Sequence, residues 1–290
     1  MPDLTREETL LDDLPDEVQL KIFKFLGIED IVHCAQVSKR ARRICYDESI
    51  WEKINLYNKV VPSDFINKIL QKGCKYINLE GSKIVGDLKL SRKDYNVKYL
   101  NLHRCDAGPG VLEKFINSCQ SLQKLSLCHM ELDSNAMKSL SHQKLQTLDL
   151  SAFRGLNLEL MTDILSCRTL TEISFRCIDL PNDSNNLVQY LVENLSNDIE
   201  KVSLAGIDCL TDEHIKTLVT RCKKIKELEL WGCRNITEDS LTSIVEHCDQ
   251  MVKLDVSHTN IGFSRNWNDE LLKFEMLPVQ GRNPFLKVKL

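Results

Sequence analysis

Apolar residues recur along the chain in one local pattern: an apolar position, two free positions, a second apolar position, one free position and a third apolar position. The pattern fits ten segments, and their last apolar residues stand at positions 56, 79, 102, 127, 150, 175, 204, 230, 256 and 290. The spacing therefore runs from 23 to 34 residues. Its alternating half is typical of a short strand that buries one face.

Five stretches with helical periodicity lie between these predicted strands, at 111–119, 158–167, 186–196, 211–222 and 237–248. Several begin with Thr, Asp or Asn, which suit helix N-caps. A period near 25 with this pattern is typical of leucine-rich repeats. One unit cannot bury its own apolar face, so the units are expected to stack into a curved α/β solenoid. Parallel strands would line its concave face, with helices outside.

The first fifty residues do not follow the repeat. Pro15 suits the first turn of a helix that Gly27 ends. A second short helix covers residues 31–35, and Ser38 can cap a third over residues 39–46. Three helices in about forty residues make a core that is marginal on its own, so this module must lean on the solenoid or on a partner.

Specific residues in this module resemble an F-box. They occur in the order Leu14-Pro15-x-Glu17, Ile22-Phe23-x-x-Leu26, Asp30-Ile31, Val37-x-x-x-x-Arg42 and Asp47-Glu48-Ser49-Ile50-Trp51. An F-box followed by leucine-rich repeats is the architecture of the F-box/leucine-rich-repeat family, and the resemblance covers nearly the whole chain. Trp51 both ends the F-box match and fills the first strand anchor, so it is expected to join the two modules.

The resemblance implies a non-catalytic substrate-recognition subunit of an SKP–cullin–F-box ubiquitin ligase. The F-box would dock on the SKP-type adaptor, which links to the cullin, and the repeats would hold a protein substrate, phosphorylated or not, for ubiquitination and degradation. Carried over by position, the adaptor-binding residues would be Leu14, Pro15, Val18, Ile22, Leu26, Ile31 and Val37. Alternatively, some of them only close the three-helix core.

These patterns predict three regions. An F-box would occupy residues 1–50, with an acidic segment at 1–9, and leucine-rich repeats would occupy 51–262. The last interval, at 263–290, is longer than the others and is expected to form an atypical capping repeat.

Composition narrows the function further. The 290-residue chain has a net charge of −4, which is too small to favour nucleic acid or a membrane surface. It contains no run of 18 apolar residues and begins with an acidic segment unlike a signal peptide, which favours the cytoplasm, the nucleus or both.

In those compartments the cysteines are expected to be free thiols. Four of the twelve cysteines, Cys119, Cys167, Cys222 and Cys248, lie six residues before a middle strand anchor, and Cys105, Cys177 and Cys233 follow a last anchor within three residues. Such recurring slots indicate packing.

No catalytic or cofactor motif is present in the sequence. Three of the seven histidines, His33, His129 and His247, adjoin a cysteine. Neighbours on a strand point to opposite faces, so we expect no dyad, no metal site and no cofactor.

The free positions beside the strand anchors should form columns on the concave face. Glu172, Lys201, Glu227 and Lys253 alternate in sign and can pair across strands, and Asn55, Asn78 and Asn101 can form an amide ladder.

The predicted substrate-binding residues lie towards the C-terminal end of the same face: Arg176, Glu229, Trp231 and Asp255. Glu229 and Asp255 would carry like charge side by side and would favour a basic partner segment, with Trp231 as its anchor. The alternative is that the C-terminal unit covers Trp231.

Two other classes of function compete with the ligase receptor. A repeat scaffold without ligase function would lack adaptor binding. A receptor for a small ligand such as an inositol phosphate would need clustered Lys and Arg on the concave face. The columns carry both positive and negative residues, which disfavours this class.

Overall fold

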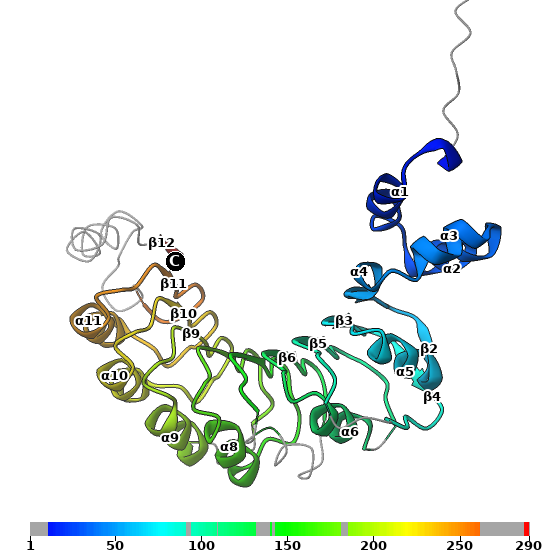
Figure 1. Ribbon diagram of the computed structural model, residues 1–290. Coiled ribbons are helices and arrows are strands. Elements are labelled where there is room, and N and C mark those ends of the chain that lie inside the picture. The colour runs from blue at the N-terminus through cyan, green and yellow to red at the C-terminus, as the bar shows by residue number, and fades with distance from the viewer. Residues whose placement is uncertain are drawn as a thin grey trace, which may run out of the picture.

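The computed structural model of the protein describes residues 11–90, 94–108, 110–131, 140, 143–180, 185–261 and 287–289. They form a curved solenoid with a small helical module at its N-terminal end (Figure 1). The strands line the inner side of the curve and the helices lie outside, as the repeat predicted.

One parallel sheet of ten strands runs through the repeats in the order β1-β3-β5-β6-β7-β8-β9-β10-β11-β12. Its strands are β1 (Lys53–Asn55), β3 (Tyr76–Asn78), β5 (Tyr99–Asn101), β6 (Lys124–Ser126), β7 (Thr147–Asp149), β8 (Glu172–Ser174), β9 (Lys201–Ser203), β10 (Glu227–Glu229), β11 (Lys253–Asp255) and β12 (Lys287–Lys289). Each strand is centred on a middle anchor, which confirms the ten predicted strands. Most of the predicted capping repeat, at 263–286, lies outside the described residues. A second sheet pairs β2 (Val60–Pro62) with β4 (Lys83–Val85).

The helices of the repeats are α5 (Ser63–Gln71), α6 (Val111–Ser118), α8 (Leu158–Leu165), α9 (Asn185–Asn194), α10 (Asp212–Arg221) and α11 (Glu238–His247). The last five begin and end within two residues of the predicted limits, whereas α5 was not predicted. The N-terminal module contains the short 3₁₀ helix η1 (Leu11–Asp13) and α1 (Asp16–Phe23), α2 (Ile28–Val37), α3 (Lys39–Cys45) and α4 (Glu48–Trp51). Among the described residues no helix is both long enough and apolar enough to cross a membrane.

A left-handed backbone turn recurs two residues after the last anchor of each of the first nine units. Glycine fills it at Gly81, Gly206 and Gly232, but six other units use a residue with a side chain at a φ between 50° and 59°. These residues are Asn58, Arg104, His129, Ala152, Cys177 and His258. The turn ends the strand pattern, so side chains after it no longer alternate between the two faces.

Apolar side chains from every unit form one continuous core. Most of the predicted cysteine slots lie within it, and all twelve cysteines are free thiols. Cys177 is the exception, because it occupies the left-handed turn and is exposed, whereas Cys105 and Cys233 lie one residue beyond that turn and are buried.

Trp51 joins the two modules. It is 6 % exposed, and its indole Nε1 donates a hydrogen bond of 2.8 Å to the carbonyl oxygen of Cys45 in α3. Lys72, which follows α5, places its ammonium 4.9 Å from the Trp51 ring centroid and 4.1 Å from that of Tyr46. The indole therefore connects the last long helix of the N-terminal module to the first repeat.

His214 gives the solenoid a measurable pH dependence. The residue is 7 % exposed in α10, and its Nδ1 accepts a hydrogen bond of 3.1 Å from the Thr211 backbone N–H. Burial lowers the pKa of His214. The unfolded chain therefore protonates His214 more readily than the native protein does. The free energy of unfolding is not reduced by this residue above about pH 6.5, and it decreases as the pH falls below that value.

We expect acidification from pH 7.5 to 5.5 to lower the urea midpoint of the native protein more than that of a His214→Gln variant. His33→Gln is the matched control because His33 is exposed. Equal shifts in the native protein and His214→Gln would contradict a neutral, buried His214.

Candidate functional site

A group of apolar side chains on the N-terminal module is open to solvent. Phe25 is 91 % exposed and Val37 81 %, while Val18, Val32 and Ile22 are about two-fifths exposed. Small modules rarely leave so many large apolar side chains uncovered unless a partner binds them. We call these five residues the apolar F-box face.

Six of the seven predicted adaptor-binding residues reach the surface at least in part. Pro15, Val18, Ile22 and Val37 are exposed, and Leu14 and Leu26 are half-buried. Ile31 differs from the prediction because it is 4 % exposed and packs in the core, which places it beneath the surface.

Phe25 was missed by the sequence reasoning. Phe23, two residues earlier, is 1 % exposed and fills the core, and the helical turn between them points Phe25 outward. The N-terminal module has more apolar residues than a three-helix core can hold, and this excess could have indicated that some of them, such as Phe25, are exposed.

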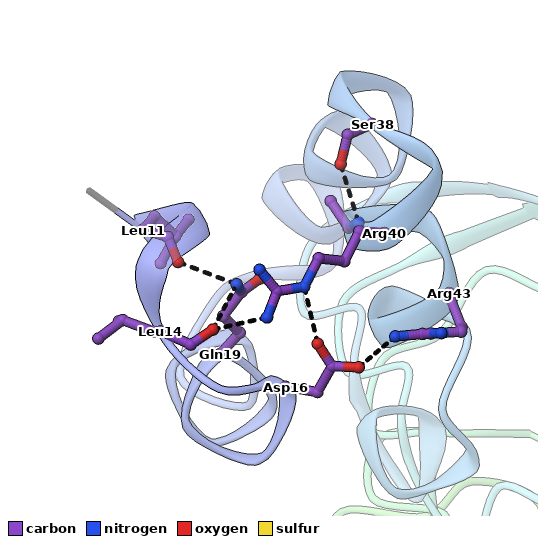
Figure 2. Close-up of polar contacts among 8 residues, drawn as sticks. Leu11, Leu14, Asp16, Gln19, Ser38, Arg40 and Arg43 are labelled. Carbon is purple, nitrogen blue, oxygen red and sulfur yellow. Dashed lines mark hydrogen bonds and ion pairs between the residues drawn. The ribbon is translucent and has the colours of Figure 1, made fainter. Parts of the chain in front are cut away.

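A polar network fixes the Leu14–Asp16 turn against α3 (Figure 2). Arg40 donates from Nε to Asp16 Oδ1 at 2.8 Å and from Nη2 to the Leu14 carbonyl oxygen at 2.6 Å. Arg43 pairs with the second Asp16 oxygen. Gln19, 1 % exposed, donates from Nε2 to the carbonyl oxygens of Leu11 and Leu14 at 2.9 and 3.1 Å. The network positions the start of α1, which carries Val18 and Ile22.

Asp16→Asn is expected to destabilise the N-terminal module in a pH-dependent way. The Arg40 hydrogen bond lowers the pKa of Asp16, with Arg43 acting in the same direction. The stabilisation is present above the unfolded pKa of about 4 and is lost as the pH falls through the lower folded value. The difference in melting temperature between native protein and Asp16→Asn should therefore be largest near neutral pH and should disappear in acid. Glu17→Gln, one residue along, serves as the control, and a difference that persists at pH 2 would contradict this role.

The concave columns align as predicted, because the register pairs the corresponding residues of successive strands. Lys201 Nζ lies 3.5 Å from Glu172 Oε1 and 3.1 Å from Glu227 Oε1, which confirms the alternating pairs. Lys253 instead pairs with Glu229 at 2.6 Å, diagonally across the sheet. Glu172, Lys201, Glu227 and Glu229 border a shallow hollow of about 200 Å³.

The amide ladder is only partly confirmed. Asn78 Nδ2 donates to Asn55 Oδ1 at 3.0 Å. Asn101 Nδ2 instead donates to Glu80 Oε2 at 3.3 Å, so the ladder ends after two members.

The predicted substrate residues lie together but differ in their availability. The Arg176 guanidinium carbon is 5.6 Å from the Trp231 ring centroid, and the His258 ring meets Trp231 edge-on at 5.7 Å. Trp231 is half-buried, while Arg176 and His258 are exposed. These three form what we call the Trp231 cluster. Whether residues 263–286 cover it lies outside the described residues.

The two acids are not the unpaired anions that we expected. Asp255 is 9 % exposed and accepts from Ser257 Oγ at 2.6 Å and from Lys289 Nζ at 3.1 Å. Burial alone would raise the pKa of Asp255, but the hydrogen bonds from Ser257 and Lys289 outweigh it and lower the pKa. Glu229 is held by Lys253. Each negative charge therefore has its own lysine, and an acidic patch for a basic segment is not formed.

The expectation that neighbouring Cys and His residues point apart is wrong at Cys128 and His129. Both lie beyond the end of β6, where the left-handed turn at His129 breaks strand alternation. Their ligand atoms, with one from His103, all lie within 4.8 Å of one another.

Comparison with known protein families identifies both modules. The family model described as F-box-like matches residues 11–57, and the model described as the SKP2 LRR domain matches residues 64–231. In the chain, the stretches 14–17 and 47–56 also resemble the S-phase kinase-associated F-box protein.

Curated relatives are similar over most of the chain at low identity. F-box/LRR-repeat protein 4 of Bos taurus is 28 % identical over 84 % of this chain, and F-box protein SKIP19 of Arabidopsis thaliana is 22 % identical over 88 %. Lysine-specific demethylase 2B of Mus musculus is 23 % identical over 78 % of this chain. The match covers 14 % of the demethylase, 37 % of the bovine protein and 78 % of the plant protein.

The repeat model by itself covers more than half of the 290 residues and follows the matched F-box. The chain therefore belongs to the F-box/leucine-rich-repeat family.

Proposed function

We propose that the protein is the substrate-recognition subunit of an SKP–cullin–F-box ubiquitin ligase. The F-box docks on the SKP-type adaptor, and the concave face of the repeats holds a protein substrate for ubiquitination. The chain needs no chemistry of its own for this task, because holding a substrate lysine near a ubiquitin-loaded enzyme raises its effective concentration.

The observation that carries the proposal is the apolar F-box face. The repeats leave it uncovered, and burial of one large apolar side chain contributes about 1.5–3 kcal/mol. The Arg40–Asp16 network holds the adjoining Leu14–Pro15 turn in one conformation, so less conformational entropy is lost on binding.

The Trp231 cluster is the best substrate anchor on the concave face. Trp and Arg dominate the binding energy of many interfaces, and Arg176 already stacks against the Trp231 ring. Because Glu229 and Asp255 are neutralised by lysines, the substrate is recognised by an apolar or acidic segment inserted beside Trp231, rather than by a basic one.

Two variants should separate the two binding functions. Trp231→Ala is expected to lose substrate capture and retain the adaptor, whereas Val18→Ser/Ile22→Ser is expected to lose the adaptor and retain substrate capture. Affinity purification of the tagged full-length chain from cells, with quantitative mass spectrometry, measures both. Tyr57→Ala, an exposed aromatic at the other end of the repeats, is the matched control for Trp231→Ala.

Each outcome has a defined meaning. Unchanged capture by Trp231→Ala would remove that cluster from the substrate site. Substrate capture by a chain that never brings down the adaptor would favour the scaffold without ligase function.

A further inference from the structure

Two histidines and a cysteine meet on the concave side of the solenoid, between the units of β5 and β6. His103 follows β5, and Cys128 holds the equivalent position after β6, where it is 8 % exposed. His129 is the next residue. Its ring stacks on that of His103 with centroids 5.4 Å apart and planes inclined by 17°. One ligand atom from each residue lies within 4.8 Å of the other two.

The repeat geometry explains why consecutive residues share this point. Cys128 extends the inward-facing column, and a residue after it in a regular strand would face the opposite side. The left-handed φ of 57° at His129 redirects its side chain instead. Two adjacent repeats therefore supply three convergent side chains, one after β5 and two after β6.

His103 is oriented as a metal ligand would be. Its Nδ1 lies 3.7 Å from Glu80 Oε1, and the other Glu80 oxygen accepts from Asn101 Nδ2. Its Nε2 is buried and has no hydrogen-bond partner. Metal-binding histidines commonly direct the remote ring nitrogen to a carboxylate and leave the other lone pair for the ion. An unpartnered buried nitrogen is otherwise costly, so this atom calls for a ligand.

We propose that His103, Cys128 and His129 bind a zinc ion, with water in the fourth position. Imidazole nitrogen and thiolate sulfur are the donors that Zn²⁺ prefers, and three protein ligands with one open position is a common zinc arrangement. The set contains no oxygen donor, which disfavours Mg²⁺ and Ca²⁺. This site does not depend on the ligase assignment.

Arg104 opposes metal binding in the metal-free arrangement. Its Nη2 lies 3.2 Å from His129 Nε2, and its own side chain is exposed and free to move into solvent. A cation beside the ligands repels Zn²⁺, and its hydrogen bond competes for the His129 lone pair. Removal of this guanidinium should therefore strengthen binding, whereas most substitutions near a metal site weaken it.

Cobalt substitution tests the site directly in the purified full-length chain. Co²⁺ titrated under a non-thiol reductant should give one equivalent of tetrahedral visible bands and a thiolate-to-cobalt charge-transfer band. Zn²⁺ should displace it, and competition with a chromophoric chelator gives the zinc affinity. Cys128→Ser should abolish the charge-transfer band, and His103→Ala should abolish the tetrahedral bands. Circular dichroism confirms that each variant is folded.

Two further variants probe the surrounding residues. Glu80→Gln should weaken zinc binding by about 10-fold, as expected for loss of a carboxylate that orients a ligating histidine. Arg104→Gln should strengthen it. Cys177→Ser and His258→Ala change exposed residues at the same turn position in other units and should leave the zinc affinity unchanged.

The proposal is overturned if the full-length chain binds no Co²⁺ or Zn²⁺ above its non-specific level. It is also overturned if the charge-transfer band survives Cys128→Ser, or if Cys177→Ser removes it. Equal affinity in native protein and Arg104→Gln would contradict the arrangement of ligands described here.

Discussion

Val18→Ser/Ile22→Ser is expected to weaken binding of the SKP-type adaptor by at least about 30-fold. Both side chains lie on α1 and are about two-fifths exposed, so each presents apolar surface to a bound partner. An anchor residue at a protein interface contributes at least about 2 kcal/mol, so the loss of even one such anchor corresponds to that factor. Isothermal titration calorimetry with purified adaptor measures the change.

Phe25→Ser provides a cleaner form of this experiment. Phe25 is 91 % exposed, so its removal leaves the core of the module intact. Leu158→Ser is the matched control, because Leu158 is 55 % exposed at the start of α8, outside the apolar F-box face. If Val18→Ser/Ile22→Ser and Phe25→Ser bind the adaptor as tightly as Leu158→Ser does, the adaptor does not use this face.

The largest effect on stability is expected from Phe175→Ala. Phe175 is the last anchor of the β8 unit and is fully buried at 0 % exposure. Truncation of a buried phenylalanine costs about 3–5 kcal/mol, through lost transfer free energy and the cavity that remains. Because each repeat buries its apolar face only against its neighbours, the cavity weakens both adjoining interfaces. Urea unfolding followed by circular dichroism measures the loss.

Phe175→Leu separates cavity formation from a general intolerance of substitution. Leucine keeps most of the buried volume, so its cost should be clearly smaller than that of alanine. A loss below about 1 kcal/mol for Phe175→Ala would contradict a closely packed core at this unit.

The repeat pattern predicted the architecture closely because each anchor has one physical role. An apolar residue such as Leu125 or Leu148 must face the core, and strand alternation then sets the orientation of its two neighbours. The register of adjacent strands follows from stacking identical units. For this reason the column from Lys53 to Lys253 could be derived without coordinates.

Some side-chain pairings were not predictable, because they join residues outside the regular strand columns or diagonally across them. Asp255 and its partner Lys289 are 34 residues apart, so nothing local indicated that this charge is neutralised. The position of Ile31 depends on how three short helices close over one another. The convergence of Cys128 with His129 depends on a left-handed backbone φ that favours glycine, and the residue type at this position did not reveal it because six units carry a residue with a side chain there.

Binding of the intact chain to purified SKP-type adaptor is the most direct test of the central claim. The account predicts a one-to-one complex by calorimetry, with the negative heat-capacity change that apolar burial produces, and loss of this signal in Phe25→Ser and Val18→Ser/Ile22→Ser. A folded chain, verified by circular dichroism, that forms no complex with the adaptor would contradict the assignment as a ligase substrate receptor.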